Sequence, residues 1–262
     1  MKKYYAIARA EWLDAIQNRA EISVYILIEI IPILIIIFLW QSNGRFITHG
    51  LSTSQLVTYY LGVLVCSRLT GFYFDQSTQE QIRDGTFSRF LLKPLRMPFA
   101  FVPQNLGGKV FNTLFLLLPI IIFIVSVFHK QIIMAPISSW PLVIASLIVA
   151  YLLNFFISKI VTTVAFFWEQ SSALVHIKWV LESVAGGYLL PLSMFPTRIK
   201  DILNLLPFKY LFYFPTSIYI GELSYSEALD GLIIGILWAG VLGLISNAFW
   251  NSGLKRYSSV GG

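Results

Sequence analysis

Four charged side chains fall inside long apolar stretches of the sequence: Glu29, Arg68, Lys159 and Glu182. A charge inside a membrane costs free energy, so such residues pair with one another, line polar paths or relay ions. Glu29 and Arg68 stand on consecutive apolar runs and can therefore form an ion pair. The alternative for Lys159 and Glu182 is that their side chains reach out to the membrane surface. We interpret the four as candidate intramembrane pathway residues.

Catalytic chemistry has no comparable candidates. An ATP-binding loop requires G-x-x-x-x-G-K-[ST], but around Gly108–Lys109 the sequence has Pro103 in place of the first glycine and Val110 in place of the hydroxyl residue. The G-x-S-x-G pattern is absent, and the single cysteine and three separated histidines have no metal-binding spacing. We therefore expect no catalytic, cofactor-binding or metal-binding residue in this chain.

A polar segment over residues 75–105 is the next feature of interest. From Gln76 to Leu92 it mixes charged and apolar residues, and Gly85 suits a turn with positive φ. Pro94 and Pro98 would end the second helix. The pattern predicts a helix–turn–helix whose apolar side rests on the membrane interface. The alternative is a solvated loop, but a simple connector would be shorter, which favours an ordered docking element.

Residues 195–228 form a second unusual segment. Prolines interrupt it too often for a membrane span, yet it is too apolar for water; they are Pro196, Pro207 and Pro215, preceded by Pro191. Non-helical backbone at membrane depth must be covered by protein or line a wet cavity. We expect half-helices that re-enter the outer leaflet, with a Tyr and Phe belt over residues 210–219 at the headgroups. The alternative is a plain interfacial loop.

The composition identifies the elements that must position these residues. Of 262 residues 56% are hydrophobic and 12% charged, and the mean hydropathy is +0.72. This excludes a soluble enzyme, a disordered chain and a fibrous repeat. Because a span needs about 20 apolar residues, we predict an all-α integral membrane protein, one domain over residues 1–262, with six spans. These lie at 22–40, 55–74, 107–128, 140–167, 173–194 and 229–250.

The N-terminal residues 1–21 precede the first span and mix both signs of charge, unlike a cleavable signal. Within residues 4–19 the apolar positions recur at helical spacing, which predicts an amphipathic interfacial helix. Its apolar face comprises Tyr5, Ala8, Trp12, Ala15 and Ile16, and its outward face Glu11, Asp14, Gln17 and Asn18.

Orientation follows from the distribution of Lys and Arg, which concentrate on the cytoplasmic side. With the N-terminus inside, 12 basic residues lie inside and 5 outside. The inner set is Lys2, Lys3, Arg9, Arg19, Arg83, Arg89, Lys93, Arg96, Lys109, Lys178, Lys255 and Arg256, and the outer set Arg45, Lys130, Arg198, Lys200 and Lys209. Both termini are therefore predicted to be cytoplasmic. This bias also accounts for the net charge of +6 without a nucleic-acid partner.

Four features together resemble the membrane subunit of ABC-2 type transporters, in its branch of small bacterial permeases. These are the N-terminal amphipathic helix, the inner pattern Ile82, Gly85, Phe87, Leu91–Leu92 and Pro94, the prolines before the last span, and an ending from Phe249–Trp250 through Gly253–Leu254 and Arg256–Tyr257 to Gly261. The resemblance implies a half-transporter in the bacterial inner membrane. It would pair with a second permease, identical or related, above separately encoded ATPase subunits that hold ATP and Mg.

The resemblance also implies which residues contact the ATPase. In the family, the segment matching Gln79, Glu80, Ile82, Arg83, Asp84, Gly85 and Phe87 is the coupling helix, and the N-terminal helix also contacts the ATPase. The expected function is export of an amphiphilic, lipid-, peptide- or drug-like substrate, in contact with membrane lipid. A self-contained secondary transporter or channel that uses the buried charges is the alternative, although no inverted repeat supports it. A membrane enzyme or an assembly scaffold is a third.

Overall fold

The computed structural model describes residues 2–17, 20–42, 51–92, 100–168 and 171–257, and in these ranges it is helical with no strand. The helices are α1 (Lys2–Gln17), α2 (Ala20–Ser42), α3 (Thr53–Thr70), α4 (Asp75–Arg83), α5 (Ser88–Leu91), α6 (Phe101–Asn112), α7 (Leu118–Phe128), α8 (Trp140–Thr163), α9 (Ser172–Ala185), α10 (Thr197–Leu205), α11 (Tyr213–Tyr219) and α12 (Tyr225–Arg256). A π-helical turn, Thr113–Leu117, joins α6 to α7.

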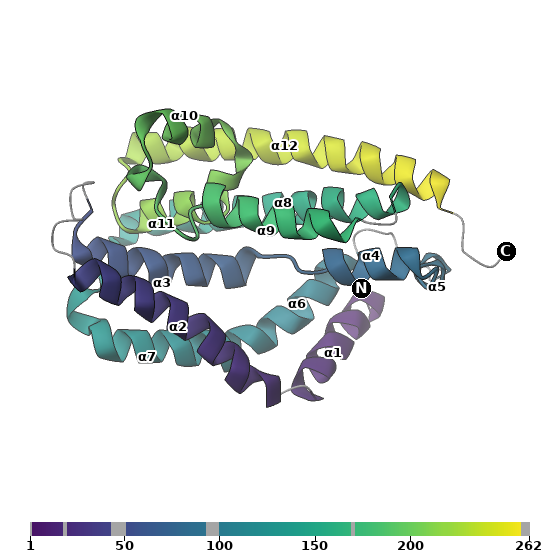
Figure 1. Cartoon of the computed structure of the whole chain (residues 1–262), viewed down its shortest axis with the longest axis horizontal. Helices are drawn as coiled ribbons and strands as arrows, with labels where there is room; N and C mark the ends of the chain where they lie inside the picture. The colour runs from purple at the N-terminus through teal and green to yellow at the C-terminus, as the bar shows by residue number, and fades with distance from the viewer. Residues whose placement is uncertain (1, 18–19, 43–50, 93–99, 169–170, 258–262) are drawn as a thin grey trace.

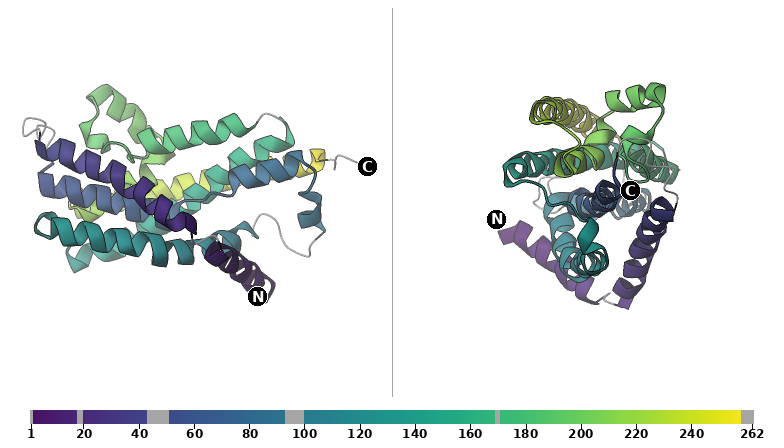
Figure 2. Two further views of the ribbon diagram at one scale, coloured as in Figure 1. Left: turned by 60° about the horizontal axis from the view of Figure 1, so that its bottom comes forward. Right: turned by 90° about the vertical axis from the view of Figure 1, so that its left-hand side faces the viewer.

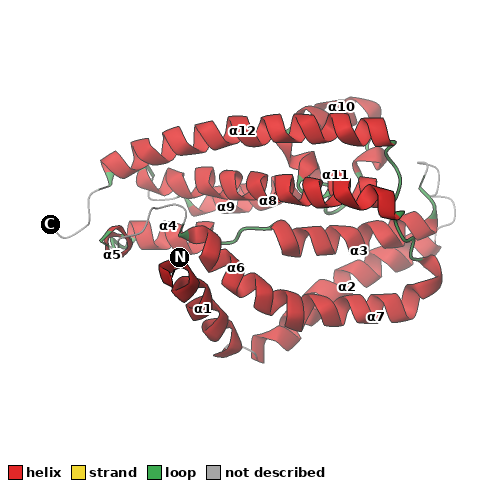
Figure 3. Ribbon diagram, turned by 180° about the vertical axis from the view of Figure 1, so that it is seen from behind, coloured by secondary structure: helices red, strands yellow, loops and turns green. Residues whose placement is uncertain are grey.

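The long helices run along the same axis and stack in layers. Figure 1 shows α12 above α8 and α9, these above α3, and α2 and α7 below. Figure 3, from behind, shows α6 leading into α7 on the same side of the bundle as α1. Helices α4 and α5 lie toward the end of the bundle near both termini, and α1 crosses obliquely below (Figure 2). The opposite end holds α10 and the tip of α7.

Among the described residues, four helical stretches are long and apolar enough to cross a membrane: Thr53–Arg83, Phe101–Gln131, Ile137–Phe166 and Tyr225–Arg256. They contain the predicted second, third and sixth spans, and the fourth except for its last residue, Phe167. Helix α2 covers the predicted first span with 23 residues, which gives a length of about 35 Å. Four capable stretches agree with an integral membrane protein, whereas the number six stays a prediction.

The predicted fifth span, 173–194, is wrong as a continuous helix. Helix α9 has only 14 residues, about 21 Å, which is short of the bilayer core. It ends at Ala185 because the chain turns at Gly187, whose φ is +83°. The turn is held from inside the bundle, where Tyr59 Oη donates to the Gly187 carbonyl at 2.6 Å and Tyr213 N–H donates to the Gly186 carbonyl at 2.9 Å.

Helix α11 lies inside the protein, against α3 and α8. Tyr210 is fully buried, and Tyr213 through Ile218 are all buried. The predicted headgroup belt over residues 210–219 is therefore wrong, because these rings fill the core rather than face lipid. The prolines do divide this segment into short helices as predicted. Protein covers α11, as membrane depth requires, whereas most residues of α10 are exposed.

The predicted helix–turn–helix at Gln76–Leu92 is present as α4 and α5, joined at Gly85 with φ +74°. Pro94 and Pro98 lie outside the described residues. Ile82 and Phe87 pack on protein, which corrects the prediction for these two side chains, whereas Leu91 of α5 and the adjoining Leu92 are exposed, so contact of α5 with the membrane interface stays a prediction. Phe87 is fully buried against the rings of Phe166, Trp250 and Tyr257. The C-terminal end of α12 therefore anchors the element.

Candidate functional site

The centre of the site is the ion pair between Arg68 of α3 and Glu29 of α2. Arg68 Nη2 contacts Glu29 Oε1, with side chains that are 22% and 13% exposed. Helix α2 is apolar around Glu29, so a charge of opposite sign is the partner that offsets the desolvation of the carboxylate. Arg68 Nε and Glu29 Oε2 are buried without a hydrogen-bond partner. The pair is therefore only partly satisfied within the chain.

Glu182 of α9 joins this pair at one polar cavity of about 380 Å³. Its lining comprises Glu29, Ser67, Arg68, Tyr73, Trp179, Glu182, Ser183, Tyr188 and Phe212. Two carboxylates, one guanidinium and four aromatic rings thus face the same space. Three of the four predicted pathway residues meet here.

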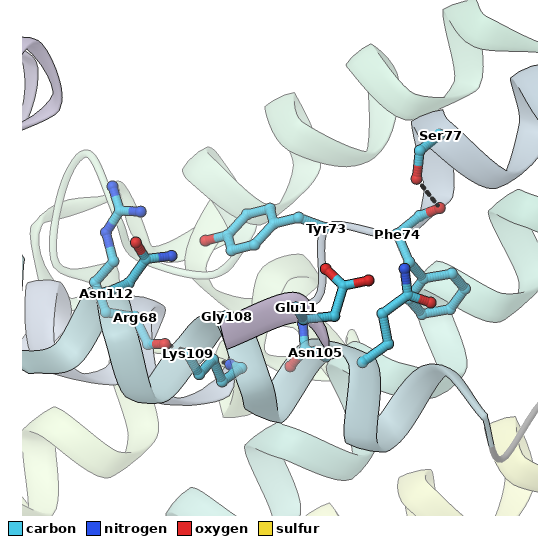
Figure 4. Close-up of a pocket in the computed structure, with 10 residues that line it drawn as sticks. Glu11, Arg68, Tyr73, Phe74, Ser77, Asn105, Gly108, Lys109 and Asn112 are labelled. Atoms are coloured by element: carbon cyan, nitrogen blue, oxygen red, sulfur yellow. Dashed lines mark hydrogen bonds between the residues drawn. The ribbon is translucent and has the colours of Figure 1, made fainter. Parts of the chain in front are cut away.

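A second polar cavity, about 250 Å³, shares Arg68 and Tyr73 with the first and lies against α6. Figure 4 shows Glu11, Arg68, Tyr73 and Lys109 around it. Asn105 Oδ1, in its lining, is buried without a hydrogen-bond partner. Arg68 is therefore the charged residue common to two adjoining polar spaces.

The position of Glu11 corrects the predicted outward face of α1. Glu11 shares a helical face with Ala8, Trp12 and Ala15, and that face packs on α6. The ring of Trp12 meets that of Phe111 edge-on at 5.5 Å. Burial raises the pKa of Glu11 above its ordinary value, a hydrogen bond with Gln104 opposes this, and Asp14 adds to it. Spacing alone places Glu11 near this face, because 8, 11, 12 and 15 follow the helical period.

Lys109 belongs to α6, and its side chain reaches the C-terminal end of α3. Its Nζ donates to the carbonyls of Leu69 at 2.8 Å and Arg68 at 3.3 Å. The last carbonyls of a helix lack partners within the helix, and a lysine is a suitable donor to them. Lys109 therefore stabilises the backbone that carries Arg68.

A buried ion pair that the sequence did not reveal links α4 to α9. Lys178 Nζ lies 2.6 Å from Asp75 Oδ2, and the two side chains are 2% and 1% exposed. The same Nζ donates to Ser158 Oγ at 2.7 Å and to the Phe72 carbonyl at 3.3 Å, and it lies 3.7 Å from Glu182 Oε1. Lys178 was counted among the cytoplasmic charges, and the structure shows that its side chain is paired inside the bundle rather than exposed.

Lys159 is separate from the cavities. It is 1% exposed between α8 and α12, where Nζ donates to Asn247 Oδ1 and lies 6.0 Å from the centre of the Trp250 ring. The alternative that its side chain reaches the membrane surface is therefore wrong. Lys159 joins two helices and does not line either polar cavity.

The seven predicted coupling residues divide into two groups. Gln79, Ile82 and Phe87 are buried, and Gln79 Nε2 donates to the Val161 carbonyl at 2.8 Å. By contrast, Glu80, Arg83 and Asp84 are exposed, and Gly85 forms the turn. Helix α4 buries its residues at positions 75, 78, 79 and 82 and therefore presents the opposite polar face outward.

An apolar cavity of about 400 Å³ lies further along α3. Its lining includes Gly62, Val65, Cys66 and Leu69 of α3 and Thr216 of α11. Helix α3 thus lines both polar cavities and an apolar one. Among the described residues, no three His, Cys, Asp or Glu side chains gather as a metal site would require.

The model of the ABC-2 family transporter proteins matches residues 26–261, which is most of the chain. Curated proteins and solved structures gave no match.

Proposed function

The chain belongs to the ABC-2 transporter family and has the role of an ABC permease, and we propose that it is half of the translocation path of an ATP-driven bacterial exporter. Separately encoded ATPase subunits would supply ATP and Mg, and this chain would supply the path. We place it in the bacterial inner membrane with both termini in the cytoplasm.

The observation that carries this proposal is that α4 and α5 bury apolar side chains in the protein and expose a polar face. Ile82 and Phe87 anchor the element in protein, while Glu80, Arg83 and Asp84 stand outward at the end of the bundle. A rigid element with a polar outer face is suited to bind a soluble partner, because it need not be ordered on binding. We propose that the ATPase docks on this face.

The path for the substrate would pass the two polar cavities. An amphiphilic substrate, whether lipid-, peptide- or drug-like, could place its polar group at Arg68 and Glu29 and its apolar part along α3. ATP binding would draw the docking element toward the ATPase dimer, and the short connection from α4 to α3 would transmit this as a rigid-body shift.

A second permease, identical or related, would complete the path. The cavity of Glu29 and Glu182 has walls that are partly open, since Tyr73 and Trp179 are 56% and 40% exposed. Charges next to such an opening are costly in lipid. A facing permease would cover them and form the other half of the path.

Co-purification from the native membrane tests this function. The wild-type chain should retain a soluble protein with an ATP-binding loop, and Arg83→Glu should lose it while membrane insertion persists. Arg198→Glu is the matched control, since Arg198 is an exposed arginine on α10 at the opposite end. Equal recovery of the ATPase with both variants would exclude the docking face, and a chain that purifies alone would exclude the ABC assembly.

The alternative is a self-contained secondary transporter, and the observation that favours it is the convergence of Glu29, Arg68 and Glu182 on one cavity. Such a protein would move substrate on a proton gradient alone. Transport that requires ATP and persists after the gradient is collapsed would exclude this alternative.

A further inference from the structure

Lys178 of α9 contacts two other segments of the chain, residues 72–75 and α8. Its Nζ contacts Asp75 at the start of α4, Ser158 of α8 and the carbonyl of Phe72 in the connection between α3 and α4, at 2.6, 2.7 and 3.3 Å. A lysine ammonium has three donors, so these contacts satisfy it completely. The docking element is thereby tied to α9, to which no short stretch of chain connects it.

This connection matters because α9 has little else to hold it. Of its 14 residues, three are buried: Val175, Lys178 and Ala185. Of the other eleven, seven are exposed, including the apolar side chains of Ile177 and Val180. Lys178 is therefore the charged contact on which the position of α9 relative to α4 depends.

One helical turn beyond Lys178, the same face of α9 reaches the polar cavity. Glu182 Oε1 lies 3.7 Å from Lys178 Nζ, and Glu182 lines the cavity together with Trp179, Arg68 and Glu29. Asp75, Lys178 and Glu182 thus form a continuous charged link from α4 to the cavity wall. A packed ion pair resists separation because either partner alone would be a buried, unpaired charge.

We propose that Lys178 is a positioning residue for transport: it makes the Trp179–Glu182 wall of the cavity move together with α4. This inference rests on the proposed function, in which the ATPase displaces α4. When α4 moves, Asp75 draws Lys178 and therefore α9, and the distance between Glu182 and the Glu29–Arg68 pair changes. Without the link, α4 moves and the cavity wall stays behind.

The experiment measures both movements separately in the complex of the full chain with its ATPase, in lipid nanodiscs. Spin labels at Gln76→Cys and Asn251→Cys report α4 against α12, and labels at Val180→Cys and Leu244→Cys report α9 against α12. These four positions are exposed, while the native Cys66 is buried and escapes labelling. Distances are recorded by double electron–electron resonance without nucleotide and with ATP trapped by vanadate.

In the wild type, trapped ATP should shift both distance distributions. In Lys178→Met the α4 distance should still shift and the α9 distance should lose its shift. Asp75→Asn keeps the shape of the side chain and should give the same result, a shift of the α4 distance without a shift of the α9 distance. It replaces Lys178→Met if that variant does not fold. Lys159→Met is the matched control: it removes another buried lysine, but one bonded to Asn247 and unconnected to α4, and both shifts should remain.

The outcomes separate the two proposals. If the α9 shift persists in both Lys178→Met and Asp75→Asn, the link is overturned while ATPase docking on α4 stands. Loss of the α9 shift in Lys159→Met as well would show general loosening and would also overturn the specific role of Lys178. If α4 itself does not move in the wild type, the proposed docking function fails, and the inference fails with it.

Discussion

The hydroxyl of Tyr257, one residue beyond the last helix, donates to the carbonyl of Gly85 at 3.0 Å and accepts from the N–H of Ser88 at 3.1 Å. The C-terminal end of α12 therefore holds the turn between α4 and α5 from both sides. The order of the proposed docking element thus depends on a residue 172 positions away in the chain.

Tyr257→Phe should loosen this turn while leaving the aromatic packing intact. Two hydrogen bonds are lost, each worth about 0.5–1.5 kcal/mol. Hydrogen exchange of residues 85–92 should accelerate by roughly tenfold, the effect of about 1.4 kcal/mol. Tyr219→Phe is the control, because the contact of the Tyr219 hydroxyl within the described residues is a weak one, to the sulfur of Met134 at 3.9 Å. Unchanged exchange in Tyr257→Phe would show that Phe87 alone orders the turn.

Gly107→Ala should separate α1 from α6. A Cβ at Gly107 would lie 2.2 Å from the Ala8 carbonyl oxygen, which is backbone and cannot move aside by rotation. The adjacent Gly108→Ala is a matched control, since a Cβ there meets nothing within 4 Å, and it should be neutral or slightly stabilising because Ala favours the helix. Disulfide cross-linking between introduced cysteines on α1 and α6 measures the separation. Equal cross-linking in both variants would refute the close helix contact.

Neutralising one member of the Glu29–Arg68 pair should cost more than neutralising both. Either Glu29→Leu or Arg68→Leu leaves a charge without its partner, at a cost of about 3–5 kcal/mol, whereas the double variant should recover most of it. Equilibrium unfolding in detergent, analysed as a double-mutant cycle, measures this coupling. Additive losses would mean that the two side chains are solvated independently. Transport that stays unchanged in the double variant would remove the pair from the proposed path.

Stability should fall as the pH rises through the titration of Glu11. Burial raises its pKa in the folded state above the ordinary value of a glutamate carboxyl group, about 4.3. The folded state therefore binds more protons than the unfolded state, and the stability of the folded state decreases with pH from about that value upward until Glu11 is ionised. Glu11→Gln should be the more stable protein at neutral pH, and the difference should vanish at low pH.

Thermal unfolding across pH measures this difference between Glu11→Gln and the wild type. Asp230→Asn, which removes one exposed carboxylate from α12, is the control for the change in charge. A difference between Glu11→Gln and the wild type that stays constant across pH would contradict the assignment to Glu11.

Much of the architecture could be predicted because it is local or compositional. The lengths of apolar runs indicate the membrane-capable helices, the prolines divide the segment around Pro207, and Gly85 marks the turn. The Glu29–Arg68 pair could also be anticipated, since both charges stand on consecutive apolar runs and each needs a partner. These features depend on the chain within one helix or on two neighbouring helices.

The remaining features depend on which helix faces meet, and here an apolar pattern carries little information. In a membrane protein, the sequence pattern of an apolar face is the same whether lipid or protein covers that face. The pattern around Tyr210 and Phe214 therefore predicted rings at the headgroups, although these rings are buried in the protein. Asp75 and Lys178 resembled ordinary interfacial charges because each stands near a span end, 103 residues apart. Composition and the lengths of the apolar runs identify a membrane permease with a polar helix–turn–helix after its second apolar run. The pairing of Asp75 with Lys178 depends instead on the packing of α9 against α4 and α8, which brings distant parts of the chain together.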